Sequence, residues 1–160
     1  MQADNQALKD LVGDTLLKVN GDKIDQVDFN TFNGKVASAK FICFYFGAHW
    51  APPSRLFTEN LKSKVYDEVN KDGCAVEVIF VSDDRKEDHF ERNFKKMPWY
   101  SVPFTQEQRI QTLKSKFSVI ELPTLVVLDK SGKIVSHEGR QDVAKGVQAL
   151  KDWEAKLQEQ

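Results

Sequence analysis

The chain has 160 residues, with 23 Lys or Arg against 24 Asp or Glu, so its formal net charge is −1. A chain of this length buries roughly two-thirds of its unfolded surface, so it needs neither disulfides nor a metal to fold. Two cysteines are too few for a disulfide-rich secreted scaffold. Because the sequence has no basic excess, we expect no nucleic-acid ligand.

The sequence carries no sign of membrane insertion or secretion. Residues Met1 to Asn5 contain no basic segment followed by an apolar one, and no run approaches the ~18 apolar residues of a membrane span. No repeat or linker-like tract divides the chain. We therefore expect a single domain over residues 1–160, located in the cytoplasm or the nucleus, with reduced thiols.

The N-terminal part of the chain predicts a β-hairpin followed by a buried strand. Leu16 to Val19 and Lys23 to Val27 flank the dipeptide Asn20-Gly21, which is a strong hairpin signal. Lys40 to Phe46 is apolar, rich in β-branched and aromatic residues, and too short for a helix. Cys43 lies within this predicted strand, so we expect it to be a small buried hydrophobe.

A long amphipathic helix is predicted over Pro52 to Lys71, with Gly73 just past its end. Its apolar residues recur every three or four positions: Leu56, Phe57, Leu61, Val65 and Val69. Ala75 to Val81 then predicts a second buried strand. Cys74 stands at the start of that strand, where we expect a partly exposed thiol that nothing in the sequence activates.

The next segment predicts a shorter helix and an aromatic loop. Asp84 and Glu87 are spaced as in a capping box, which would open a helix through Phe90 and Phe94. The loop from Met97 to Phe104 contains two prolines and three aromatic residues. Such loops usually serve packing, and they can also form the rim of a substrate site.

The C-terminal part predicts a second hairpin and a final helix. Pro123 to Leu128 predicts a third buried strand, which the turn Asp129 to Gly132 connects to an antiparallel strand at Lys133 to His137. The final helix carries an apolar stripe: Val143, Val147, Leu150 and Leu157. Strands that alternate with helices predict an α/β fold with a central mixed sheet covered on both faces.

Chemistry is most expected between Phe46 and Arg55, where the first buried strand leads into the long helix. A helix N-terminus at the carboxyl end of a strand stabilises a thiolate and lowers its pKa. Pro52 and Pro53 suit the first turn, because their missing N–H groups would have no partner there. The segment contains no cysteine, and taken alone it also fits an ordinary helix start beside a core tryptophan, Trp50.

A second notable segment is Glu121 to Thr124, in which Pro123 stands at the start of a central strand. Proline cannot donate to the sheet, so it marks a first residue, an edge or a bend, and a cis bond before it is compatible with this position. From the local sequence alone, a plain strand start is the favoured explanation of the segment.

Taken together, these segments resemble the tryparedoxin and nucleoredoxin branch of the thioredoxin superfamily, from about Lys40 to Arg140. In that branch such a strand leads into Trp-Cys-Pro-Pro-Cys-Arg. Further landmarks that match are Val81-Ser82-Asp83-Asp84-Arg85, Met97-Pro98-Trp99, Val102-Pro103-Phe104 and, at the cis-proline loop, Leu122-Pro123-Thr124. The resemblance implies a thioredoxin fold with an N-terminal β-hairpin, and a substrate site formed by Trp50, Pro52, Pro53, Leu122 and Pro123.

The departure from the family motif is at the redox positions, which hold Ala51 and Ser54 instead of cysteines. In the family the first position carries the nucleophilic thiolate and the second the resolving thiol. Dithiol exchange needs both, so the resemblance implies a thiol-disulfide oxidoreductase scaffold that is inactive as it stands. A hydrolase built on Ser54 and His49 is disfavoured, because nothing in the sequence indicates an acid to orient the histidine.

Two hypotheses follow. In the first, the chain is a nucleoredoxin-like or tryparedoxin-like protein-disulfide oxidoreductase whose redox cysteines have been replaced by Ala51 and Ser54. In the second, it is a natural non-catalytic thioredoxin-fold module that binds a protein partner. Both expect a disulfide-containing or other protein partner, no membrane and no cofactor, and the sequence leaves the oligomeric state open. His89 and His137 have no metal-ligand spacing, so we expect no metal site.

Overall fold

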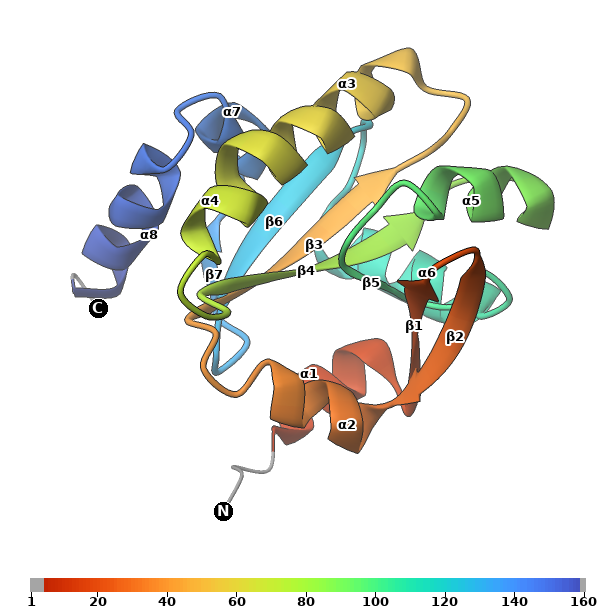
Figure 1. The fold of residues 1–160 in the computed structure, drawn as a ribbon, viewed down its shortest axis with the longest axis horizontal. Coiled ribbons are helices and arrows are strands. Elements are labelled where there is room, and N and C mark those ends of the chain that lie inside the picture. The colour runs from red at the N-terminus through yellow and green to blue at the C-terminus, as the bar shows by residue number, and fades with distance from the viewer. Residues whose placement is uncertain (1–4, 159–160) are drawn as a thin grey trace.

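The computed structural model describes residues 5–158, which form a seven-stranded mixed sheet in the order β2-β1-β5-β4-β3-β6-β7. The strands are β1 (Thr15–Asn20), β2 (Lys23–Asp28), β3 (Phe41–Gly47), β4 (Val76–Ser82), β5 (Tyr100–Ser101), β6 (Thr124–Asp129) and β7 (Ile134–Ser136). In the centre β3 runs parallel to β4 and antiparallel to β6 (Figure 1). The predicted mixed sheet is confirmed.

Helices cover both faces of the sheet, as the periodicity predicted. One face carries α1 (Gln6–Val12), α2 (Phe29–Lys35) and α6 (Glu107–Lys116). The other carries α3 (Pro52–Asn60), a π-helical turn (Leu61–Tyr66), α4 (Asp67–Val69), α5 (Glu87–Phe94), α7 (Gly139–Val143) and α8 (Gln148–Gln158). Within residues 5–158, no helix is long and apolar enough to cross a bilayer.

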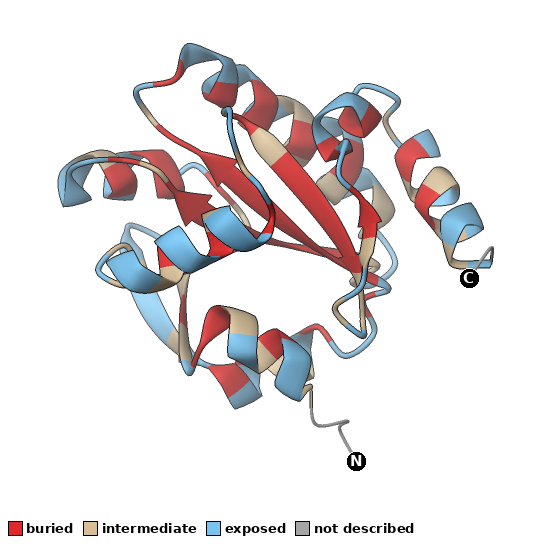
Figure 2. Cartoon of the chain, turned by 180° about the vertical axis from the view of Figure 1, so that it is seen from behind, coloured by how far each residue is buried: buried red, intermediate tan, exposed pale blue. Residues whose placement is uncertain are grey.

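The two central strands form the middle of the core because both of their faces are covered. Every residue of β3 and β4 is buried, and Figure 2 shows both strands in red between helices whose outer faces are exposed. Successive side chains alternate between the two faces. Thus Cys43 and Tyr45 point into the core beneath α3 and α8, while Phe44 and Phe46 point into the core beneath α1, α2 and α6.

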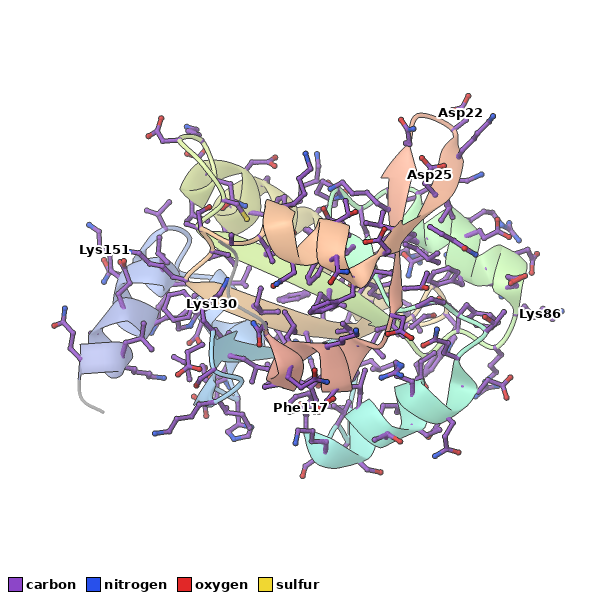
Figure 3. The ribbon with its side chains drawn as sticks, turned by 90° about the horizontal axis from the view of Figure 1, so that it is seen from below. Asp22, Asp25, Lys86, Phe117, Lys130 and Lys151 are labelled. Atoms are coloured by element: carbon purple, nitrogen blue, oxygen red, sulfur yellow. The ribbon has the colours of Figure 1, made fainter. Side chains whose placement is uncertain are left out.

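The N-terminal hairpin is confirmed, with its turn one residue later than the dipeptide suggested. Asn20 pairs with Lys23, so the turn residues are Gly21 and Asp22, and Gly21 adopts a φ of 63° that favours glycine. The hairpin projects from the body of the molecule, and Figure 3 shows Asp22 at its tip and Asp25 farther along β2. The second predicted hairpin, β6–β7, is also antiparallel.

Several local expectations are wrong or incomplete. The capping box is wrong, because α5 begins at Glu87 after Lys86 and the Asp84 carboxylate instead accepts the backbone N–H of His49 at 2.7 Å. The single final helix is also wrong. Gly146, at a φ of 63°, separates α7 from α8 and leaves Val147 exposed between them. The elements α1, α2, α6 and β5 were not predicted.

Candidate functional site

The candidate site begins where β3 ends and α3 starts. Ala51 is the N-cap of α3 and makes no side-chain cap hydrogen bond, and Pro52 and Pro53 occupy the first two helical positions. Ala51 is 6% exposed and Ser54 is 1% exposed, whereas the two prolines are exposed. The positions that resemble the family's redox cysteines therefore hold a buried methyl group and a buried hydroxyl group.

A buried tyrosine anchors the first turns of α3 from below. The Tyr45 hydroxyl donates to the backbone carbonyl of Ser54 at 2.9 Å and lies 2.6 Å from the Thr58 hydroxyl. Burial raises the pKa of Tyr45 to about 12, so the phenol remains protonated and can donate. The sequence marked Tyr45 only as a core residue. A polar atom in an otherwise apolar strand was the signal that could have identified this role.

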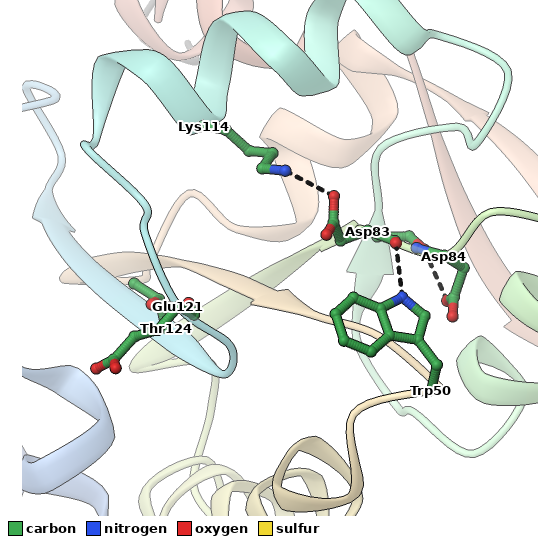
Figure 4. Close-up of polar contacts among 7 residues, drawn as sticks. Trp50, Asp83, Asp84, Lys114, Glu121 and Thr124 are labelled. Carbon is green, nitrogen blue, oxygen red and sulfur yellow. Dashed lines mark hydrogen bonds and ion pairs between the residues drawn. The ribbon is translucent and has the colours of Figure 1, made fainter.

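Trp50 is held in place over the start of α3 by the segment that follows β4. Its indole Nε1–H donates to the carbonyl of Asp83 at 3.0 Å (Figure 4). The Arg85 guanidinium lies 5.5 Å from the ring centroid. The Asp83 carboxylate in turn forms a 2.7 Å ion pair with Lys114 of α6. Trp50 is nevertheless 49% exposed, so one part of the ring is free to meet a ligand.

Opposite Trp50 lies the loop that leads into β6. The Leu122–Pro123 peptide bond is cis, Pro123 is buried, and Leu122 is partly exposed. Between this loop and Trp50 is a cavity of about 210 Å³, which we call the Ala51 pocket. Its lining residues are Trp50, Ala51, Asp83, Lys114, Val119, Ile120, Glu121 and Leu122.

The structure brings some of the sequence-predicted site residues together and separates others. Trp50, Ala51 and Leu122 line the same pocket. Pro52 and Pro53 lie on the exposed side of the helix start, and the Ser54 hydroxyl is directed into the interior without a hydrogen-bond partner among the described residues. The sequence did not predict that Asp83 and Lys114 form one wall of the pocket, because an ion pair between residues 31 apart in the chain leaves no local pattern.

The two cysteines lie away from the Ala51 pocket and are both free thiols. Cys43 is fully buried in β3, and burial raises the pKa of its thiol far above the ordinary range. Cys74, just before β4, is half-buried, and burial together with the Glu77 carboxylate raises its pKa to about 12. Both thiols are therefore protonated and poorly nucleophilic at neutral pH, as the sequence predicted.

Beside Cys74, two side chains replace a missing neighbour strand. β5 pairs only with Ile79 and Phe80 of β4, which leaves the first half of β4 without a strand on that side. The Asn70 side chain bonds both the N–H and the C=O of Val76, at 3.1 and 2.9 Å. The buried Glu77 carboxylate accepts the Val78 N–H at 3.0 Å and the Tyr66 hydroxyl at 2.8 Å. Burial raises the pKa of Glu77.

Among the described residues, the histidines form neither a catalytic site nor a metal site. His49 and His89 have ring centroids 5.6 Å apart, and within residues 5–158 no three His, Cys, Asp or Glu residues are grouped to hold a metal. His49 Nδ1 and Ser54 Oγ both have no hydrogen-bond partner among these residues. They therefore do not form the nucleophile and base of a hydrolase.

Comparison with known proteins agrees with this fold. A family model described as thioredoxin-like matches residues 39–134. Nucleoredoxin from Bos taurus is 34% identical over 135 residues, which cover 84% of this chain and 29% of the relative. The chain therefore spans less than a third of that relative's length.

Solved structures show the same likeness over most of their length. Native tryparedoxin I from Crithidia fasciculata is 32% identical with a TM-score of 0.71, and the match covers 86% of this chain and 90% of that one. A thioredoxin from Wuchereria bancrofti is 34% identical with a TM-score of 0.70, over 91% and 96% of the two chains. The chain belongs to the thioredoxin-like family. Within that family it falls in the branch of the tryparedoxins and nucleoredoxins.

Proposed function

We propose that this chain is a thioredoxin-like module that binds a segment of a protein partner at the Ala51 pocket and does not perform dithiol exchange. The observation that carries the proposal is a mismatch: the positions where the family has its redox cysteines hold no thiol, whereas the thiols of this chain lie at other positions. The first turn of α3 holds Ala51 and Ser54, and the chain's two thiols lie elsewhere with raised pKa values.

The chemistry of disulfide reduction explains why this mismatch matters. A first thiolate attacks one sulfur of the partner's disulfide, which forms a mixed disulfide and releases one thiolate of the partner. A second thiol, after losing its proton, displaces the partner's other sulfur and leaves a disulfide in the enzyme, so two electrons pass to the partner. Ala51 offers no nucleophile for the first step. The Ser54 hydroxyl, which has no base beside it, cannot perform the second.

The remaining parts of a thiol-disulfide scaffold support the binding half of the proposal. Trp50 is fixed by its bond to Asp83, and the cis Leu122–Pro123 loop faces it across the pocket. A site that keeps its walls but lacks its reacting atoms can bind a partner without turnover.

The test is reduction of insulin disulfides with dithiothreitol as the electron donor, for this chain and for an Ala51→Cys/Ser54→Cys version. We expect the chain to give no rate above the dithiothreitol background and the double variant to turn over. Turnover by the unaltered chain would overturn its proposed inactivity. A double variant that is folded by circular dichroism but inert would overturn the claim that the scaffold retains redox geometry.

A further inference from the structure

The size of the Ala51 pocket limits what can occupy it. Its volume of about 210 Å³ is below the range of about 300–1,000 Å³ that is typical of sites for cofactors and drug-sized ligands. A cavity of this size suits a single side chain from a larger partner. A larger hollow of about 540 Å³ lies elsewhere, between α1 and α6, and does not include any residue of the α3 start.

The surface of the pocket is apolar where a reducing relative would present a thiol. The methyl group of Ala51 is part of its lining, and the Trp50 ring, Val119 and Leu122 add further apolar surface. Ile120 lines the same pocket and is 94% exposed. A half-exposed tryptophan beside an almost fully exposed isoleucine forms an apolar surface that is available for a partner to cover.

Three charged residues line the pocket: Asp83, Lys114 and Glu121. Lys114 and Asp83 pair with each other at 2.7 Å, and Figure 4 shows the Glu121 carboxylate pointing away from Trp50. The helix start offers no ready anion site either. Pro52 and Pro53 have no N–H, and the Ser54 N–H donates to the Ala51 carbonyl at 2.9 Å. The exposed Arg85 lies against the Trp50 ring but does not line the pocket. The lining itself therefore directs no unpaired charge at an occupant, which suits an uncharged group.

We propose that the Ala51 pocket is an anchor for one bulky uncharged side chain, aliphatic or aromatic, of a protein partner. This inference rests on the proposed function and specifies its partner: the recognised segment needs a large apolar residue and no cysteine. Trp50 is already held by Asp83 and Arg85, so little of the binding free energy is spent on ordering the pocket wall. Because the pocket buries this side chain, a peptide that carries it should bind at least about tenfold more tightly than the same peptide with serine at that position.

The experiment uses random short peptides displayed on phage and selected against the full chain. Selected peptides are then titrated while tryptophan emission is recorded. Trp50 is the exposed reporter, because Trp99 and Trp153 are fully buried. We expect selected peptides to share one large aliphatic or aromatic residue and to shift the emission of Trp50. Replacing that residue by serine should weaken binding by about tenfold or more.

Variants of the protein locate the binding. Ala51→Leu adds volume to the lining of the pocket and should weaken the binding of the selected peptides by about tenfold or more. Val147→Ser is the matched control. Val147 is 50% exposed, close to the exposure of Trp50, and does not line the pocket, so its loss should leave affinity unchanged. The serine-substituted peptides test the same contact without altering the protein, so a folding defect in Ala51→Leu would not hide the answer.

The outcomes separate this inference from the function it rests on. If peptides shift Trp50 emission but tolerate serine at every position, the apolar anchor is wrong and the binding function stands. If the selected peptides bind Ala51→Leu as tightly as the unaltered chain, the pocket is not the anchor. If no selected peptide changes Trp50 emission, both the anchor and the proposed binding function are wrong.

Discussion

The two ends of the parallel pair β3–β4 each lack one requirement of thiol chemistry: one end has an open pocket but no thiol, and the other has a thiol that is kept protonated. At the carboxyl end, the start of α3, Trp50 and the cis Leu122–Pro123 loop surround an open pocket that contains no sulfur. At the amino end, Cys74 provides a thiol, but burial and Glu77 keep it protonated. A thiol's place in this fold therefore decides its reactivity, and the presence of cysteine in the sequence does not.

The largest expected effect comes from placing a thiol at the carboxyl end. In an Ala51→Cys variant, we expect the new thiol to be alkylated by iodoacetamide at pH 7 about a hundredfold faster than Cys74. An ordinary thiol with a pKa of about 8.5 has a far larger thiolate fraction than one at about 12, and the higher intrinsic nucleophilicity of the latter offsets only part of this. Mass spectrometry of timed samples measures both rates.

The matched control for this experiment is Ala144→Cys, which adds an exposed thiol at the C-cap of α7, far from the pocket in sequence. It should react as an ordinary surface thiol. Equal alkylation rates for Cys74 and the thiol introduced at position 51 would show that the two ends do not differ as described.

A smaller effect is expected when the existing cysteines are changed. Cys43→Ser places a hydroxyl in a fully buried apolar environment and should lower the free energy of unfolding by about 2 kcal/mol. Cys74→Ser keeps a polar atom within reach of Glu77, so it should change the free energy of unfolding by less than about 0.5 kcal/mol. Urea unfolding measures both, and Cys43→Ala separates lost packing from the buried hydroxyl. A similar cost at the two positions would contradict the difference in burial.

The smallest effect concerns the pH dependence that Glu77 imposes at the amino end. Its pKa is raised in the folded protein, so above its ordinary value of about 4.3 the folded state binds more protons than the unfolded state. Stability from this group is therefore fully present below that pH and falls as the pH rises through the folded pKa. The slope is at most about 1.4 kcal/mol per pH unit.

Glu77→Gln should remove this fall while it retains an oxygen for the Val78 and Tyr66 bonds. Urea unfolding of both proteins at a series of pH values gives the comparison, and the stability of the variant relative to the unaltered chain should increase with pH. A difference that stays constant, or that runs in the opposite direction, would rule out a raised pKa for Glu77.

The sequence predicted those elements in which an apolar local pattern coincides with burial in the folded protein. Lys40 to Phe46 and Ala75 to Val81 are apolar and β-branched, and both form buried strands. It missed α6, which buries only Ile110 and Leu113. It also missed α2, a seven-residue helix in which Phe29 and Phe32 are the only buried residues. These helices form because their few apolar side chains are covered by the sheet, and short patterns cannot report that.

The candidate site was predictable in part for similar reasons. Trp50, Ala51 and Leu122 were marked by their resemblance to a motif, and the structure places all three around one cavity. The Asp83–Lys114 wall and the Tyr45 bond to the Ser54 carbonyl depend on side chains that meet only after folding. Asp84 shows the converse. Its spacing from Glu87 suggested a helix cap, but the His49 N–H and the Ser82 hydroxyl hold its carboxylate.

The incomplete pairing of β4 has a consequence for self-association. A strand with free N–H and C=O groups is a template on which another chain can add a strand and begin to aggregate. In this molecule the Asn70 amide already bonds the N–H and the C=O of Val76, and the Glu77 carboxylate accepts the N–H of Val78. Glu77, which together with burial raises the pKa of Cys74, thus also protects this part of β4 from pairing with an added strand.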